Sequence, residues 1–304
     1  MKVRATVIIP TFGNAKFARW AIKSVQRQTV QDIEICIICD GSPEDMISFF
    51  KDMEKEDPRL KVFVFPKSPR TGEPYRDIVI KQTTGNIICY CGHDDLWLPH
   101  HIEEMEKSLR KCWFTHSLHT FIHAAKKMKD EKTLSASIQR SNLKDPEIIQ
   151  RMLCGENFFG LTYGAHTRKS YNKLEEGWVT TPRKDIATDL YMWRKFLSAY
   201  GNRCKTTMKV TALNFQHTIR KDWSGQERDS ELKQYFEKIQ DPSFLREIDK
   251  LRSRYRLSFF YQKIKNLIKN SLLYLYYKKK RRRSHDSNKG RRYGKRIHAQ
   301  GPTR

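Results

Sequence analysis

Two adjacent carboxylates follow a short apolar stretch and form the part of the sequence best suited to chemistry. Residues 87–91 are Ile-Ile-Cys-Tyr-Cys, which is typical of a buried strand, and residues 93–99 read His-Asp-Asp-Leu-Trp-Leu-Pro. An unpaired carboxylate is costly to bury, so Asp94 and Asp95 at a strand end predict a nearby cation. Divalent cations that also bind phosphates take one or two protein carboxylates and keep positions open for phosphate oxygens. The alternative is an ordinary loop in which an aspartate caps the helix that begins near Pro99.

Polar residues also follow two other apolar stretches in the first half of the chain. Residues 10–14 read Pro-Thr-Phe-Gly-Asn, and residues 40–42 read Asp-Gly-Ser. Apolar stretches alternate here with segments of helical spacing, which predicts an α/β fold with a mostly parallel sheet covered by helices on both faces. Ligands bind at the carboxyl ends of the strands in such sheets. The expected strands are 3–9, 33–39, 62–65 and 87–91, and the expected helices are 16–28, 43–53 with Ser42 as its cap, and 103–109.

The second half of the chain gives fewer clear elements. Residues 188–200 have the pattern of an amphipathic helix, and residues 208–215 are typical of a strand. His116, His119 and His123 have the spacing i, i+3 and i+7, which would place them on one face of a helix. A metal site there is conceivable, but a packed or solvated face is favoured because no carboxylate accompanies them. The sequence contains neither GxGxxG nor GxxxxGK[ST], the fingerprints of dinucleotide sites and P-loops.

Positive charge is concentrated at the C-terminal end. The formal net charge is +25, and residues 251–304 hold 18 Lys and Arg against one acid, Asp286. This region predicts an amphipathic helix over 256–283 that lies in the interface of an anionic membrane, and a disordered basic tail over 284–304. The alternative is a helix packed on the domain with a solvated tail. The apolar positions at helical spacing are Leu257, Phe260, Ile264, Leu267, Ile268, Leu272 and Leu275, and the unbroken basic stretch is Lys278–Arg283.

The cysteines and the N-terminal residues favour a cytoplasmic protein. The N-terminal residues show no secretory core or cleavage site, and no stretch approaches the ~20 apolar residues of a membrane span. The seven cysteines lie mostly in apolar stretches, which favours buried reduced thiols over disulfides or zinc ligands. We therefore expect a cytoplasmic protein that is peripheral on the inner face of the cell membrane.

Five short motifs occur in an order that is more informative than any one of them. The motifs are Val7-Ile8-Ile9-Pro10-Thr11-Phe12, Cys39-Asp40-Gly41-Ser42, Thr84-Gly85-Asn86-Ile87-Ile88 leading to Asp94-Asp95, Thr188-Asp189-Leu190-Tyr191-Met192-Trp193, and His217 followed by Trp223-Ser224. Together they resemble glycosyltransferase family 2, whose members have the GT-A fold, and the resemblance covers about residues 3–225. The chain departs from the family where Cys39 and Thr188 replace acidic residues, and where residues 91–93 replace the first acid of the metal-binding DxD motif.

The resemblance implies roles for the residues that would bind the donor. Asp40 would accept a hydrogen bond from the nucleobase, and Pro10 and Thr11 would line the base and ribose. Arg76 would pair with phosphate, and Arg70 is a second candidate at which a solvated charge is favoured. The alternatives are a turn aspartate that bonds its own backbone at position 40, and solvated charges at the two arginines.

The resemblance also implies a metal, Mn²⁺ or Mg²⁺, that bridges the two phosphates. Asp94 would hold it, with Asp95 as partner or supporting group, and His217 would bind the metal or a phosphate from the far side. His93 is a further candidate ligand, although a loop role is favoured. On this interpretation Asp94→Asn should abolish metal-dependent donor binding.

Asp189 is the expected catalytic base. Deprotonation of the attacking sugar hydroxyl needs a carboxylate within hydrogen-bond reach, and in this family a single displacement inverts the anomeric carbon. The structural alternative is that Asp189 caps the helix it begins. Asp185 is the second candidate base. Trp178 and Trp193 could stack on sugars, but as single aromatic residues they are expected in the core.

The resulting hypothesis is an inverting glycosyltransferase. It would move a sugar from a nucleotide-sugar donor, with UDP expected, to a hydroxyl of a saccharide or lipid-linked acceptor in cell-surface polysaccharide synthesis. The expected organisation is a catalytic domain over 1–225 and a helical linker over 226–255, followed by the amphipathic helix and tail. A nucleic-acid-binding protein is disfavoured because most of the basic excess lies in the tail. A nucleotidyltransferase is disfavoured because residues 10–14 lack the Gly-rich basic loop it needs.

Overall fold

The computed structural model describes residues 2–13, 15–124 and 134–257, together with positions 260, 264, 265, 268 and 271. It divides into two compact units, Met1–Arg252 and Ser253–Arg304. The elements of the first unit are β1 (Ala5–Thr11), α1 (Ala18–Gln26), β2 (Ile33–Asp40), α2 (Glu44–Glu56), β3 (Leu60–Phe65), α3 (Glu73–Lys81), β4 (Ile87–Tyr90), β5 (Leu96–Trp97), α4 (His101–Leu109), β6 (Phe114–His116), β7 (Thr120–Ile122), β8 (Ala136–Ile138), α5 (Pro146–Cys154), η1 (Leu161–Tyr163), β9 (Gly164–Thr167), α6 (Arg168–Tyr171), α7 (Thr188–Tyr200), η2 (Gly201–Arg203), β10 (Cys204–Thr206), β11 (Ala212–Leu213), η3 (His217–Ile219) and α8 (Gly225–Lys238).

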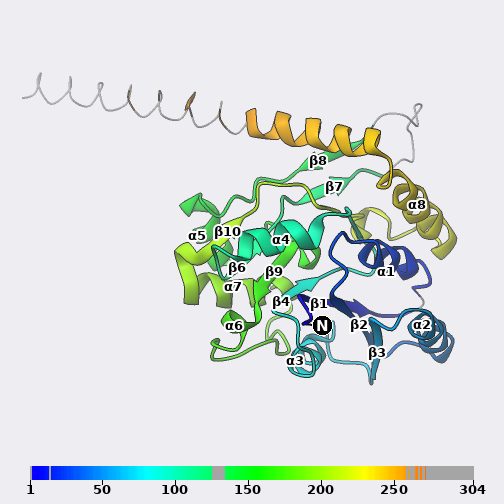
Figure 1. Ribbon diagram of the computed structural model, residues 1–304. Helices are drawn as coiled ribbons and strands as arrows, with labels where there is room; N and C mark the ends of the chain where they lie inside the picture. The colour runs from blue at the N-terminus through cyan, green and yellow to red at the C-terminus, as the bar shows by residue number, and fades with distance from the viewer. Residues whose placement is uncertain are drawn as a thin grey trace, which may run out of the picture. The chain divides into compact units, whose positions relative to one another are not determined.

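A seven-stranded, mostly parallel sheet forms the centre of the first unit, as the sequence predicts. Its strand order is β10-β6-β9-β4-β1-β2-β3. Strands β4, β1, β2 and β3 are parallel to one another, and β9 runs antiparallel between β4 and β6. In Figure 1, α2 lies beside β3 at one edge of the sheet and α7 beside β10 at the other. Strands β2 and β4 are buried along their whole length, because helices cover both faces of a parallel sheet.

The carboxyl ends of the central strands meet at one edge. The register pairs Thr11 of β1 with Cys39 of β2, and Asp40 with Phe65 of β3. A small antiparallel sheet of β5 and β11 lies close to this edge, because β5 follows β4 after a loop of five residues, 91–95. The predicted polar segments therefore gather where a doubly wound fold binds its ligands.

Several local predictions were wrong. Only Ala212–Leu213 of the predicted strand 208–215 pairs as a strand, and Met208 has a φ of 56° that is incompatible with a strand. Pro43, not Ser42, is the N-cap residue of α2, and the Ser42 hydroxyl has no hydrogen-bond partner in the described parts of the chain.

The three spaced histidines do not share a helix. His116 ends strand β6, while His119 and His123 flank strand β7. The first two are buried and the third is exposed. A spacing of i, i+3 and i+7 carries helical meaning only if the backbone is helical, and short strands interrupted by turns give the same spacing by chance.

The thiols and the large aromatic side chains follow the sequence prediction more closely. All seven cysteines of the described chain are free, and only Cys154 is exposed. Burial raises the pKa of Cys36 to about 12, which keeps it protonated and unreactive. Trp178 and Trp193 are both in the core, with exposed fractions of 2% and 0%.

Helix α8 belongs to the first unit, although residues 226–255 were predicted as a linker. Ser224 caps it, and the Ser224–Glu227 pair forms a complete capping box. Phe236 packs against Trp20 of α1 at 5.3 Å between ring centroids, and Asp229 pairs with Arg19 at 2.6 Å. These contacts fix α8 against α1.

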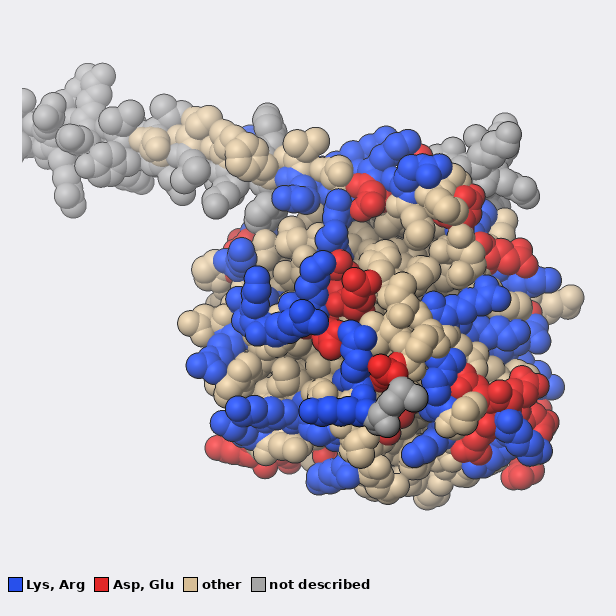
Figure 2. Space-filling model, viewed as in Figure 1, with Lys and Arg blue, Asp and Glu red and all other residues tan. Residues whose placement is uncertain are grey.

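The second unit is described at only a few positions. Leu257, Phe260, Ile264 and Ile268 are exposed. The rest of the predicted amphipathic helix and the whole predicted tail, 284–304, lie outside the described residues. In the parts of the chain that are described, no helix is both long and apolar enough to cross a membrane. Figure 2 shows basic side chains mixed with acidic ones over one face of the first unit.

Candidate active site

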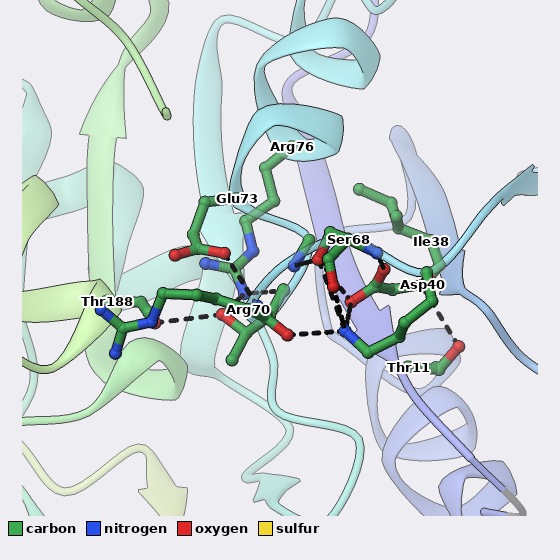
Figure 3. Close-up of polar contacts among 11 residues, drawn as sticks. Thr11, Ile38, Asp40, Ser68, Arg70, Glu73, Arg76 and Thr188 are labelled. Carbon is green, nitrogen blue, oxygen red and sulfur yellow. Dashed lines mark hydrogen bonds and ion pairs between the residues drawn. The ribbon is translucent and has the colours of Figure 1, made fainter. Parts of the chain in front are cut away.

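Asp40, at the end of β2, is held by residues that follow β3. Its carboxylate is buried and accepts hydrogen bonds from the Ser68 amide nitrogen at 2.6 Å and the Ser68 hydroxyl at 2.9 Å. Lys67 Nζ pairs with it at 2.8 Å, and Figure 3 shows Asp40 beside Ser68. Gly72 has a φ of 74° and passes so close that a Cβ there would lie 3.3 Å from Asp40 Cβ. The partners of Asp40 thus come from the segment after β3. They are not the backbone of its own turn, as the alternative prediction required.

Arg76, in the first turn of α3, is buried with part of its hydrogen-bonding capacity unused. Nη2 donates to the Thr71 carbonyl at 2.7 Å, and the guanidinium lies 4.6 Å from the centroid of the Trp178 ring. Within the described residues, Nε and Nη1 have no hydrogen-bond partner. Burial lowers the pKa of Arg76, while the nearby charges of Glu73, Asp189 and Asp40 raise it. Unpaired N–H groups are costly to bury, so they indicate a site for an acceptor oxygen.

Arg70 joins this region to the segment that leads into α7. The sequence favoured a solvated charge at this position, but its guanidinium donates to three backbone carbonyls of residues 181–186. These belong to Thr181 at 3.3 Å, Ile186 at 3.1 Å and Arg183. The Thr71 and Thr188 hydroxyls also meet at 3.2 Å. Figure 3 shows Arg70 and Arg76 between Asp40 and Thr188 in that view.

Asp189 lies in the first turn of α7, at the end of that segment. Its Oδ1 accepts hydrogen bonds from Asn157 Nδ2 at 3.0 Å and from the Leu190 amide at 2.8 Å. Burial raises the pKa of Asp189, and these hydrogen bonds and the Arg76 charge offset the rise in part. A higher pKa makes the carboxylate a stronger base. Ala187 is the N-cap residue, yet Asp189 does accept one first-turn amide, so the helix-cap alternative describes part of its environment.

Asp95 is a structural centre of the loop after β4. Its carboxylate accepts hydrogen bonds from Asn214 Nδ2 at 2.8 Å, from the Phe215 amide at 3.1 Å and from the Thr162 hydroxyl. It therefore ties the loop to the end of β11 and to η1. Burial and the neighbouring charge of Asp94 raise the pKa of Asp95 to about 7.

Asp94 pairs with a buried arginine, Arg228, which the sequence did not predict as part of the site. Arg228 of α8 donates from Nη2 to Asp94 Oδ2 at 3.1 Å and to the Phe215 carbonyl at 3.4 Å. Its guanidinium also lies 5.1 Å from the centroid of the Phe17 ring, on whose ring His93 stacks at 5.8 Å. The Asp94–Arg228 ion pair therefore joins the loop after β4 to helix α8.

The remaining predicted residues lie apart from these contacts. Pro10 and Thr11 end β1, where the Thr11 hydroxyl donates to the Ile38 carbonyl at 3.2 Å. His217 is exposed at the start of η3. Asp185, the second candidate base, is exposed and pairs with Arg183 at 3.0 Å.

The predicted metal ligands do not make a metal site of their own. Across the described chain, no three His, Cys, Asp or Glu side chains are grouped so that they could hold an ion. Asp95 is already saturated by three donors, and Asp94 is already paired with a guanidinium. Gly92 lies among residues 91–93, which replace the first acid of the DxD motif, and a Cβ there would lie 2.9 Å from Asp95 Oδ2. The donor set does not fit a divalent cation as the chain stands.

Sequence reasoning missed the groups that hold the predicted residues. Lys67, Asn157 and Thr162 carry no motif, so nothing in the sequence connects them to Asp40, Asp189 and Asp95. Arg228 had one available signal. Ser224-x-x-Glu227 is a capping box, which predicts a helix start four residues before Arg228.

The comparison with known families agrees with this geometry. The sequence profile described as "Glycosyl transferase family 2" matches residues 6–174, which is more than half of the chain. The chain belongs to glycosyl transferase family 2. The recognised part covers β1 through α6, and so includes Asp40, Arg76 and Asp94 but not Asp189 or Arg228.

Individual relatives are similar over parts of the chain. Over 92 residues it is 29% identical to a GalNAc(5)-diNAcBac-PP-undecaprenol beta-1,3-glucosyltransferase of Campylobacter jejuni, which covers 30% of each chain. Over 148 residues it is 34% identical to an uncharacterized glycosyltransferase of Rickettsia conorii, which covers 48% of this chain and 24% of the relative. The chain thus matches less than a third of either relative.

Solved structures support the fold. S. aureus TarS 1-349 in complex with UDP-GlcNAc superposes with a TM-score of 0.53 at 16% identity, covering 70% of this chain and 58% of that one. Similarity at this level of identity shows the fold alone, and it agrees with the GT-A fold expected from the sequence.

Proposed function

We propose that this protein transfers a sugar from a nucleotide-sugar donor to a hydroxyl of a saccharide or lipid-linked acceptor, with inversion at the anomeric carbon. The observation that carries the proposal is Arg76. It is a buried guanidinium with unpaired N–H groups, and the negative charges of Asp40 and Asp189 both raise its pKa. A donor with its base at Asp40 and its sugar toward Asp189 would bring anionic oxygens to Arg76.

Asp189 is the proposed base of this reaction. The acceptor hydroxyl oxygen would form a bond with the anomeric carbon while the bond from that carbon to the diphosphate oxygen breaks. The hydroxyl proton would pass to the Asp189 carboxylate, and the electron pair of the broken bond would stay on the nucleoside diphosphate. Asn157 and the Leu190 amide both bind Oδ1, so Oδ2 is the oxygen better placed to take the proton.

The predicted Mn²⁺ or Mg²⁺ has no step in this scheme. Neutral donors already use both oxygens of Asp95. Asp94 pairs with a cation, but that cation is the guanidinium of Arg228. UDP is the expected nucleotide, and the acceptor class extends the lipid-linked chemistry printed in the name of the Campylobacter relative.

A thermal-shift series with the full chain tests the proposed donor. UDP, GDP, dTDP and their sugar conjugates are added with and without Mn²⁺. A ligand at about 100 times its Kd adds about 2.7 kcal/mol of stability, or roughly 5–10 °C in Tm for a unit of this size. Arg76→Met should remove the shift without unfolding the protein, because Met fills the buried volume without a charge to desolvate. The proposal fails if no nucleotide raises Tm.

We also propose that the C-terminal region binds an anionic membrane surface, as the expected peripheral location requires. Support comes from Leu257, Phe260, Ile264 and Ile268, which are exposed and recur at helical spacing. Deletion of residues 256–304 should abolish flotation of the protein with vesicles of phosphatidylserine and phosphatidylcholine, and high salt should weaken flotation of the full chain. Equal flotation of both forms would contradict the proposal.

A further inference from the structure

Arg228 is the most deeply buried positive charge in contact with the loop that follows β4. It is 4% exposed, is the fourth residue of α8, and lies 134 residues along the sequence from Asp94. One nitrogen, Nη2, binds both Asp94 and the Phe215 carbonyl. Nε has no hydrogen-bond partner among the residues that the structure describes. The guanidinium therefore keeps one buried donor that no residue of the described chain uses.

The packing of α8 places this charge without help from Arg228 itself. The neighbouring residue, Asp229, pairs with Arg19 and accepts a hydrogen bond from Trp20 Nε1 at 2.9 Å. Ser224 and Glu227 fix the first turn. Arg228 is buried but is not needed to dock its own helix. It is paired with a carboxylate at the edge of the sheet where ligands bind, which suggests that it contacts a ligand.

The carboxylates nearby are arranged for a guanidinium and not for a divalent ion. Asp94 gives Oδ2 to Arg228, and Asp95 gives both oxygens to neutral donors. A metal at Asp94 would have to displace Arg228 or lie beside its fixed positive charge. Coulomb repulsion at such short range in a partly buried site opposes that arrangement.

We propose that Arg228, in place of a divalent cation held by Asp94, supplies the positive charge that binds the diphosphate of the donor. The inference rests on the proposed function. When the anomeric carbon–oxygen bond breaks, its electron pair stays on the terminal phosphate, and Arg228 stabilises the charge that develops there. Asp94 is then a positioning residue that orients the guanidinium through one charge-assisted hydrogen bond.

Calorimetric titration of the full chain with UDP separates this role from that of a metal. The titrations are made in EDTA and again in Mn²⁺. Wild-type protein should bind UDP in EDTA with a Kd within about threefold of that in Mn²⁺. Arg228→Gln should weaken binding in EDTA by about tenfold or more, the size of a lost charge-assisted hydrogen bond. It should also gain Mn²⁺ dependence, because Asp94 is then free to accept a cation.

Three further variants control the result. Lys233→Gln removes an exposed positive charge elsewhere on α8 and should bind UDP as wild type does in both buffers. Arg228→Lys keeps the charge and should retain most binding in EDTA, which excludes a folding defect as the cause of the Gln result. Asp94→Asn should keep binding in EDTA, since Asn still accepts the hydrogen bond from Arg228. If Asp94 held a metal instead, UDP binding would depend on Mn²⁺ and Asp94→Asn would lose that binding.

Two outcomes overturn the inference, and a third has a different meaning. Wild-type protein that binds UDP only with Mn²⁺, together with an Asp94→Asn variant that loses this Mn²⁺-dependent binding, would show that a metal at Asp94 provides the charge. Manganese titrated alone into wild type should give no tight site, and an Mn²⁺ site lost in Asp94→Asn would also contradict the inference. If UDP, GDP and dTDP bind in neither buffer, the proposed function itself is wrong.

Discussion

At the scale of single residues, Asp189 offers the clearest separation of catalysis from structure. Asp189→Asn should lower kcat by about 10²–10⁴-fold, because proton transfer in the transition state is lost. Donor Kd should change little, since the carboxylate acts on the acceptor side. Asn still accepts from the Leu190 amide, so the stability loss should be roughly 1 kcal/mol or less. Turnover, UDP titration and Tm on this variant test all three.

The pH profile gives an independent check on the same residue. Burial raises the pKa of Asp189, so wild-type turnover should fall on the acid side at a higher pH than an ordinary aspartate would give. If Asp189→Asn has near-normal turnover, Asp189 only caps helix α7. Asp185 would then be the next candidate for the catalytic base.

Asp95 makes a prediction of the opposite kind, since its role is structural. Its pKa is raised to about 7 by burial and by Asp94, so the folded state keeps a proton that the unfolded state loses near pH 4. Its contribution to stability therefore falls as pH rises from about 4 to about 7. Asp95→Asn removes this titration and can keep all three contacts, because its oxygen accepts from Asn214 and Phe215 and its amide donates to Thr162.

The difference in unfolding free energy between this variant and wild type is the quantity to measure. It should shift in favour of Asp95→Asn by up to about 1.4 kcal/mol per pH unit across that window. Urea unfolding at pH 5, 6, 7 and 8 gives the difference directly. A difference that stays constant with pH would mean that Asp95 is already ionised in the folded protein at pH 5.

At the scale of elements, Arg70 and Glu73 hold the segment 181–186, and Glu73 accepts a hydrogen bond from the Thr181 amide at 3.2 Å. Arg70 binds three of its carbonyls, and this segment leads directly to Asp189. Arg70→Met should loosen the segment and misplace the base, which lowers kcat by about tenfold or more while UDP binding changes by less than about threefold. Arg183→Gln is the matched control, because its exposed side chain lies in the same segment but binds only Asp185. If Arg70→Met and Arg183→Gln lower kcat equally, Arg70 does not position the segment 181–186 for catalysis.

The elements also show what a sequence can predict about this protein. Strands β1, β2 and β4 were predictable because a strand buried on both faces must be apolar throughout, and Asp40 and Asp94 follow from the ends of those strands. The region 113–180 was not, because β6, β7 and β9 have only three or four residues each and show no period. Asp95 finds its partners 67 and 119 residues away, at Thr162 and Asn214, and no local pattern encodes those contacts.

At the scale of the whole molecule, buried histidines should set the acid limit of stability. His101, His116 and His166 have their pKa lowered to about 3, and His119 to about 4, chiefly because burial disfavours the charged ring. Each is neutral in the folded state at a pH where the unfolded chain, with a pKa near 6.5, is already protonated. Their stabilising contribution is complete above about pH 6.5 and is lost as pH falls toward 4.

Four such groups give a steep dependence that outweighs the opposite trend of Asp95. Together they contribute up to roughly 5 kcal/mol per pH unit, against a total stability of about 5–15 kcal/mol for a typical domain. We therefore expect a cooperative loss of structure between about pH 6 and pH 4, measured by circular dichroism and Tm. His116→Asn should reduce the slope by about a quarter, although it lowers stability at neutral pH. A Tm that stays level from pH 7 to pH 4.5 would show that these rings become protonated without unfolding the protein.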